Sequence, residues 1–328
     1  MCTAITFKTK DHYFGRNLDL ECSYRETVVI TPREYHFSFR HVTTPEGRLA
    51  MIGIATIADN YPLYYEATNE KGLSMAGLNF PGNAVYQQLN PAMDNITPFE
   101  LIPWILRQCA TLQDALDLLK KVSLVNEPFN TEFPLTPLHW LLSDETGSVV
   151  IEPMTEGLKI HDNPIGVLTN NPPFDYHMCN LNNYLNLTAE EPQNRFAPKT
   201  NLTPYSRGMG AVGLPGDLSS ASRFVRAAFT KLNSRCADTE SASISQFLHI
   251  LGSVAQQEGC VKVGDRYEKT VYSSCCNTTK GIYYYTTYEN SQITAVYLHN
   301  APLSSSHLIS YPLITGQQIR TVNPSVWN

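Results

Sequence analysis

The chain places a cysteine directly after its first methionine, and a strand-like run follows at once. Residues 3–7 alternate polar and apolar side chains, which predicts a half-buried β-strand beginning at Cys2. If Met1 is removed, Cys2 carries a free α-amino group beside its thiol. Such an amine has a pKa of roughly 7.7–8.0, so part of it is neutral near pH 7 and can accept the thiol proton. The pattern indicates a sheet built around an N-terminal nucleophile; the alternative is a small buried cysteine at a strand edge.

A second strand is predicted over residues 13–19, after a turn at residues 10–12. A hairpin of this length returns Arg16 and Asp19 towards Cys2. A guanidinium beside a thiol favours the thiolate, and a carboxylate orients an ammonium or an amine. Both residues are therefore candidates for the site, with an ordinary surface ion pair as the alternative interpretation.

The charge balance argues against several classes of partner. The 328 residues carry a net charge of −6 and no block of Lys and Arg, so a nucleic-acid partner is not expected. No apolar run approaches the ~20 residues that cross a bilayer, which predicts no membrane span. Because no charged-then-apolar leader begins the chain, we expect a cytoplasmic protein.

Cysteine and histidine spacing gives no sign of a metal or a disulfide framework. The eight cysteines form no C-x-x-C pair and show no coupling to the nine histidines. Disulfides are not expected without a secretion signal, and the adjacent Cys275 and Cys276 are interpreted as packing residues. We therefore expect neither a metal nor another cofactor.

The order of predicted elements alternates between strand blocks and helix blocks. A capping-box spacing at residues 97–100, with Pro98 at the first helical position, predicts one helix, and Thr111 begins another. Further helices are predicted at 219–232 and 243–254, and strands at 26–31, 50–55, 72–80, 139–142, 148–152, 165–169, 271–274, 282–286 and 293–299. This order predicts two packed sheets with helices outside. Nothing marks a domain boundary, so residues 1–328 are expected to form a single domain.

One motif is set aside. Residues 208–213 match G-x-G-x-x-G, but a dinucleotide site needs a strand before the glycines and a helix opening within them. Residues 203–206 are not strand-like, and Pro215 with Gly216 interrupts any helix directly afterwards. A nucleotide is therefore not expected.

Five separated motifs, read together, resemble the choloylglycine hydrolase family of N-terminal-nucleophile hydrolases. They are Met-Cys-Thr at 1–3, Phe-Gly-Arg-Asn-Leu-Asp at 14–19, Ala-Gly-Leu-Asn-Phe at 76–80, Leu-Thr-Asn-Asn-Pro at 168–172 and Leu-Ser-Ser-Ala-Ser-Arg-Phe at 218–224. The similarity extends over nearly the whole chain and is greatest to bile salt hydrolases of gut bacteria. It implies an α+β fold, an αββα sandwich of two antiparallel sheets between helical layers, and a homotetramer.

The resemblance also implies roles for the residues in these motifs. Cys2 would be the nucleophile and, through its amine, the base, while Arg16 would hold the thiolate and Asp19 the α-amino group. Asn170 would donate its side-chain amide to the oxyanion, Asn79 would assist there, and Arg223 would stabilise charge from the far side. Without the family, the two asparagines would be interpreted as turn residues and the arginine as a solvated helix-surface residue.

The implied substrate is a bile salt, a bile acid joined by an amide bond to glycine or taurine. Penicillin V acylases of the same family share the catalytic set, but Asn79 favours the bile salt branch because the acylases tend to have tyrosine there. A steroid needs a broad apolar cleft. Its predicted lining, carried largely by loops at 58–65 and 126–138, is Leu18, Leu20, Tyr24, Tyr61, Tyr64, Phe129, Phe133 and Leu135. A penicillin V acylase and a non-catalytic amphiphile-binding protein are the alternatives.

Overall fold

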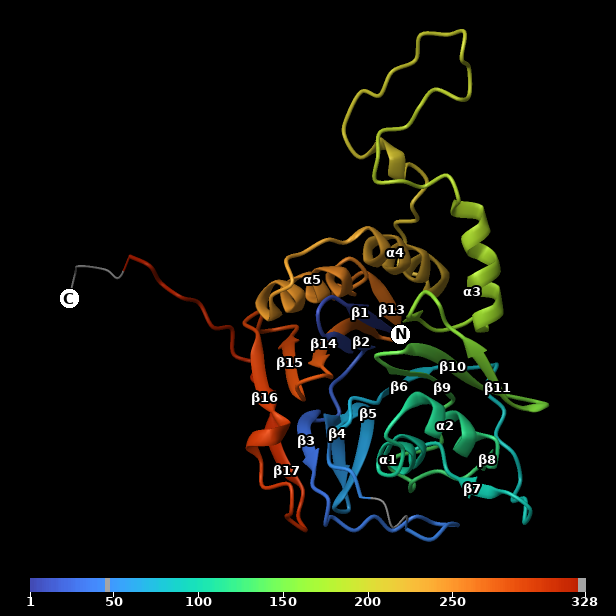
Figure 1. Cartoon of the computed structure of the whole chain (residues 1–328), viewed down its shortest axis with the longest axis vertical. Helices are drawn as coiled ribbons and strands as arrows, with labels where there is room; N and C mark the ends of the chain where they lie inside the picture. The colour runs from blue at the N-terminus through green and yellow to red at the C-terminus, as the bar shows by residue number, and fades with distance from the viewer. Residues whose placement is uncertain (45–47, 324–328) are drawn as a thin grey trace.

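A computed structural model describes residues 1–44 and 48–323 of the chain. Two antiparallel sheets face each other, and helices cover both outer faces (Figure 1). The layers therefore run helix, sheet, sheet, helix, which confirms the predicted αββα sandwich.

The first sheet contains the two N-terminal strands at its centre. Its strand order is β12-β1-β2-β14-β15-β16, with β13 paired to the outer part of β14. The bounds are β1 (Cys2–Lys8), β2 (His12–Leu20), β12 (Val167–Leu168), β13 (Val261–Val263), β14 (Arg266–Asn277), β15 (Ile282–Thr287) and β16 (Thr294–Tyr297). The N-terminal hairpin is therefore flanked by strands from the second half of the chain.

The second sheet has the order β11-β10-β9-β6-β5-β4-β3-β17. Its strands are β3 (Thr27–Thr31), β4 (Met51–Ala58), β5 (Tyr61–Asn69), β6 (Ser74–Asn79), β9 (Leu138–Asp144), β10 (Gly147–Met154), β11 (Gly157–Asp162) and β17 (Ile309–Pro312). A separate parallel pair is formed by β7 (Asp94–Ile96) and β8 (Val122–Leu124).

The helices divide between the two outer faces. Those packed on the first sheet are α4 (Ser220–Asn233) and α5 (Glu240–Gly252), with α3 (Phe174–Asn180) against α4; those on the second are α1 (Leu101–Leu106) and α2 (Leu112–Leu119). Single 3-10 turns occur at η1 (Leu181–Tyr184), η2 (Met209–Ala211) and η3 (Leu298–Asn300).

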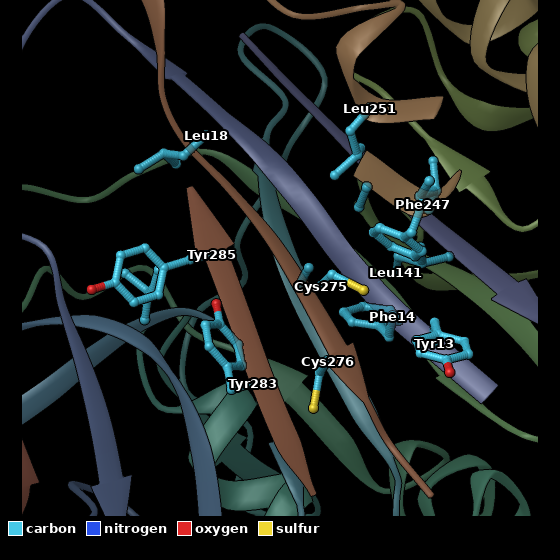
Figure 2. Close-up of a cluster of buried hydrophobic side chains, with 14 of the residues drawn as sticks. Tyr13, Phe14, Leu18, Leu141, Phe247, Leu251, Cys275, Cys276, Tyr283 and Tyr285 are labelled. Atoms are coloured by element: carbon cyan, nitrogen blue, oxygen red, sulfur yellow. The ribbon is translucent and has the colours of Figure 1, made fainter. Parts of the chain in front are cut away.

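The prediction of a half-buried first strand is wrong. Because the first sheet is covered on both faces, β1 is buried from Cys2 to Phe7. Burial on both faces also applies to β14, and Figure 2 shows its neighbouring side chains pointing to opposite sides. Cys275 points to the side on which Phe247 of α5 lies, whereas Cys276, which pairs with Phe14, points the other way. Both thiols are buried and free, as the packing interpretation predicted.

Side-chain caps begin α2, α4 and α5, but not α1 or α3. The helices predicted from Thr111 and from residue 219 are present: Thr111 forms a complete capping box with Asp114, and the Ser219 side chain caps α4. The capping signal at residues 97–100 is only half used: Glu100 accepts from the Thr97 backbone N–H at 3.0 Å, but residues 98–100 form a turn. The prediction that a helix starts at Pro98 is wrong, because α1 begins at Leu101. The last helix begins at Glu240, three residues before its predicted start.

The prediction of a loop at residues 58–65 is also wrong. Asp59 and Asn60 have positive φ angles of 49° and 60° and form a two-residue turn between β4 and β5. Asp and Asn tolerate this left-handed conformation, so the pair allows a tight hairpin in place of a long loop. The strand that follows, from Tyr61 to Asn69, forms one wall of the site described below.

Candidate active site

The register of the first hairpin brings Cys2 and Arg16 onto one face. Cys2 pairs with Leu18, and Ala4 pairs with Arg16. Since alternate residues share a face, the Cys2 and Arg16 side chains both point towards the second sheet, while Asp19 points towards α4. Arg16 and Asp19 therefore approach the start of β1 from opposite sides; the predicted hairpin returned both towards Cys2 without specifying the sides.

Arg16 is fully buried and crosses between the two sheets. Its Nη1 donates to the carbonyl oxygens of Gly77, at 2.5 Å, and Tyr65, at 3.1 Å. Its Nη2 is buried and has no hydrogen-bond partner among the described residues. Burial alone would lower the pKa of Arg16, but Cys2, Tyr272 and Glu66 together raise it above its usual value. The guanidinium therefore remains charged, with one donor group left for an anion beside Cys2.

Asp19 is fully buried on the other side of the hairpin. Its Oδ1 accepts a hydrogen bond from Thr270 Oγ1 at 2.6 Å, whereas Oδ2 has none within the described part of the chain. Arg223 Nη1 lies 4.0 Å from Oδ2. Burial raises the pKa of Asp19, and the charge of Arg223 opposes that rise. The free Oδ2 is an acceptor directed at the N-terminal region.

Arg223 connects α4 to the start of β1. Its Nη1 donates to the Cys2 carbonyl oxygen at 2.6 Å and to Thr3 Oγ1 at 2.7 Å, and its Nη2 donates to Asn170 Oδ1 at 2.8 Å. The side chain is fully buried, which excludes the alternative of a solvated helix-surface arginine.

Asn170 lies between Cys2 and Asn79. Its Oδ1 accepts from the Cys2 backbone N–H at 2.8 Å, and its Nδ2 donates to the Asn79 carbonyl oxygen at 2.7 Å. A side-chain amide carries two N–H donors, so one remains for another acceptor. The backbone of Asn170 is itself held, by Ser220 Oγ at 2.8 Å and His177 Nε2 at 2.9 Å.

The Met1 ammonium group occupies the space beside this cluster. It donates to the Asp19 carbonyl oxygen at 2.9 Å and forms an ion pair with the buried Glu268. Burial lowers the pKa of this amine, while Cys2 and Asp19 oppose the shift. Glu268 and Thr270 lie far along the chain on β14, and no local sequence signal marked either as part of the site.

A pocket of about 460 Å³ opens over Cys2, Arg16 and Asn79. Seven of the eight predicted lining residues lie on it: Leu18, Leu20, Tyr24, Tyr64, Phe129, Phe133 and Leu135. Additional lining comes from residues that the sequence reasoning missed, among them Tyr65, Phe99, Ile102, Leu138 and Trp140.

The prediction that Tyr61 lines the pocket is wrong. Its ring packs into an aromatic cluster 5.4 Å from Phe37, 5.7 Å from Phe99 and 5.6 Å from Phe129, measured between ring centroids. Its hydroxyl is buried without a hydrogen-bond partner in the described structure. Tyr61 begins a strand that packs under α1, so its side chain supports the pocket wall from behind.

Within residues 1–44 and 48–323, no group of three or more His, Cys, Asp or Glu side chains is placed to hold a metal ion. None of the helices in these ranges is long and apolar enough to cross a membrane.

Two facing sheets between helical layers, with a cysteine at the head of a central strand, are the arrangement of N-terminal-nucleophile hydrolases. Residues 2–311 match the model of the linear amide C–N hydrolases of the choloylglycine hydrolase family, and the chain belongs to this family. It is therefore an amide hydrolase by family.

Characterised relatives cover almost the whole chain. It is 56% identical to a bile salt hydrolase/transferase of Lactiplantibacillus plantarum, over 98% of this chain and 100% of that protein. A crystal structure of a conjugated bile acid hydrolase variant from Clostridium perfringens superimposes with a TM-score of 0.89 at 36% identity, covering 98% of this chain and 100% of that one. A penicillin V acylase from Agrobacterium tumefaciens shares the fold, with a TM-score of 0.71 at 18% identity over 94% of this chain and 90% of the other.

Proposed function

We propose that this protein hydrolyses the amide bond between a bile acid and glycine or taurine, releasing free bile acid and amino acid. The observation that carries the proposal is the apolar pocket directly over Cys2. Its volume of about 460 Å³ lies within the range of small-molecule sites, and its lining is mostly aromatic and aliphatic, with Arg16, Asn79, Glu127 and Glu132 among the polar members. The relatives named for bile salts support the same substrate class.

The chemistry assigns a role to each part of the site, once Met1 has been removed. The Cys2 α-amine takes the thiol proton, and the thiolate attacks the amide carbon while Arg16 stabilises its charge. The carbonyl oxygen becomes an oxyanion, for which the second Asn170 N–H and the Asn79 region are the proposed donors. The ammonium then gives its proton to the departing nitrogen, and the C–N bond breaks.

The second half of the cycle uses the same groups. The α-amine, now neutral, removes a proton from water, and the hydroxide attacks the thioester. Collapse of the second oxyanion releases the bile acid and returns the proton to the Cys2 sulfur. Asp19, through its free Oδ2, and Asn170, through Oδ1, are proposed to orient the amine.

We also propose that residues 1–328 form one domain that assembles as a cytoplasmic homotetramer without a cofactor. The segment at residues 185–212 supports assembly, since it projects from the layers beyond α3 and α4 (Figure 1). It carries exposed apolar side chains, including Phe196 at 93% exposure and Tyr205 at 87%. Such a concentration is typical of a surface that a protein partner covers.

The test is the initial rate of hydrolysis of glycocholate, taurocholate and penicillin V by the purified protein, with Met1 loss checked by intact mass. We expect preference for a bile salt. Preference for penicillin V would indicate a penicillin V acylase. It would also mean that Asn79 does not distinguish the bile salt branch from the acylases. Retained Met1 without turnover would favour an amphiphile-binding protein.

A further inference from the structure

The carboxylate of Glu66 is buried between the two sheets, directly behind Arg16. Glu66 lies on β5 and is 1% exposed. Its Oε2 lies 3.9 Å from Arg16 Nε and accepts a hydrogen bond from the Tyr272 hydroxyl at 2.6 Å. Its Oε1 accepts a hydrogen bond from the Tyr283 hydroxyl. Figure 2 shows Tyr283 beside β15.

An irregularity in β5 places Glu66 and its neighbour against the guanidinium. Ile54 pairs with Glu66 and Ala55 pairs with Tyr64, so Tyr65 is an extra residue in β5. A bulge of this kind releases a backbone group from the strand ladder. The Tyr65 carbonyl oxygen accepts from Arg16 Nη1, and the next residue supplies the carboxylate. Two groups of the second sheet, the Tyr65 carbonyl and the Glu66 carboxylate, therefore hold the guanidinium of Arg16, which belongs to the first sheet.

We propose that Glu66 is a positioning residue that shares the charge of Arg16 with the Cys2 thiolate. It fixes the guanidinium so that the unpartnered Nη2 points to the reactive pocket, and it sets the pH at which Cys2 becomes reactive. A buried charge without a partner is strongly unfavourable, so Arg16 requires a resident anion whenever the thiol is protonated. The inference deepens the proposed function, since it depends on the proposed role of Arg16 beside Cys2.

Among the described residues, few charged or titratable groups surround Glu66 or the Cys2 region. Those facing Glu66 are Arg16 on β2, Tyr272 and Cys276 on β14, and Tyr283 on β15. Those facing the Cys2 region are Arg16 and Asp19 on β2, Arg223 on α4, and Glu268 on β14. Glu66 is the carboxylate within 4.0 Å of Arg16 among the described residues.

The experiment measures the rate of Cys2 alkylation by iodoacetamide against pH, with peptide mapping to separate Cys2 from the exposed cysteines. Glu66→Gln keeps the side-chain volume and removes the charge. It leaves Arg16 free to favour the thiolate, so the half-maximal pH is expected to fall by about one unit. Tyr283→Phe is the matched control, because it removes one hydrogen bond to Glu66 and keeps the charge; its half-maximal pH is expected to stay in place.

The outcomes separate this inference from the proposed function. Arg16→Gln is expected to raise the half-maximal pH. If Arg16→Gln raises it and Glu66→Gln leaves it unchanged, the role of Glu66 is overturned and that of Arg16 stands. If neither moves it, the role of Arg16 itself is wrong. Should Glu66→Gln fail to fold, Glu66→Asp replaces it: the shorter side chain withdraws the charge, and an unchanged half-maximal pH then overturns the inference.

Discussion

The two parts of the pocket are built in different ways. Around Cys2, buried charges and amides are held by hydrogen bonds from strands, a helix and a loop, with Arg16, Asp19 and Arg223 all fully buried. Around Phe129 and Phe133, aromatic rings meet edge to face and are partly exposed. The polar part tolerates little displacement because Arg16, Asp19 and Arg223 each have at least one fixed hydrogen-bond partner. The aromatic part is held instead by the apolar area that its rings bury and by how their shapes fit. Substitutions should therefore affect rate in the first part and affinity or stability in the second.

The largest effect is expected from Cys2→Ala. Removing the proposed nucleophile should lower kcat by at least about 10⁴-fold with the fold intact, since the remaining groups cannot form the thioester. The measurement is bile salt hydrolysis together with thermal unfolding. Cys179→Ala is the control, because Cys179 is exposed and free, and its activity should equal that of the unmodified protein.

Asn170→Ala should lower kcat by about 10²–10³-fold, the usual effect of losing one oxyanion donor. Asn170→Asp sharpens the result because it retains the oxygen that accepts from Cys2 and Arg223 but lacks the amide N–H. Steady-state kinetics on both variants separate the two functions. Near-normal kcat in the aspartate variant would show that Asn170 acts through its oxygen instead.

The pH dependence of stability extends the comparison to two buried histidines, His177 beside Asn170 and His12 at the far end of β2. Burial, assisted at His12 by the charge of Lys8, lowers both pKa values from 6.5 to about 4. The unfolded chain therefore binds protons between these values that the folded chain does not, so stability falls as the pH drops from 6.5 towards 4. Each histidine should contribute on the order of 3 kcal/mol over this window.

Urea unfolding at pH 7, 5.5 and 4.5 measures this loss, and the comparison with single glutamine variants assigns it. Both His12→Gln and His177→Gln should flatten the pH dependence. Only His177→Gln should also reduce kcat, because its ring contacts the backbone of Asn170. Equal pH slopes in all three proteins would mean that other groups control acid unfolding.

Phe129→Ala should raise KM about tenfold with little change in kcat, since it removes pocket area of roughly one buried apolar side chain. Michaelis–Menten kinetics on glycocholate measure the effect. A large fall in kcat with KM unchanged would contradict the division between the two parts of the pocket.

Tyr61→Phe should give the smallest change, a gain in unfolding free energy of about 1 kcal/mol. Its hydroxyl is buried without a partner, so removing it relieves a desolvation cost while the ring keeps its packing. Urea unfolding measures the gain, and unchanged KM should accompany it. A raised KM would place the hydroxyl in contact with substrate after all.

The positions of strands and helices were predictable where they depend on residues close together in the sequence. Alternation gave the first two strands, and pairing across a short turn placed Arg16 and Asp19 beside Cys2. The helical block predicted from residue 219 corresponds to α4, which carries Arg223. The hairpin at Asp59 and Asn60 was missed because two turn residues were interpreted as part of a loop.

The sequence by itself predicted Cys2 as the nucleophile, Arg16 and Asp19 as its charged neighbours, and the family, since these predictions depend on local pairing and on motif order. Only the tertiary structure decided that Glu66 lies behind Arg16, that Thr270 bonds Asp19 from 251 residues away, and that Tyr61 turns from the pocket into an aromatic cluster. The physical reason is that these contacts cross from one sheet, strand or layer to another. They are fixed by how the layers pack and by where the bulge falls in β5, and neither leaves a periodic pattern along the chain.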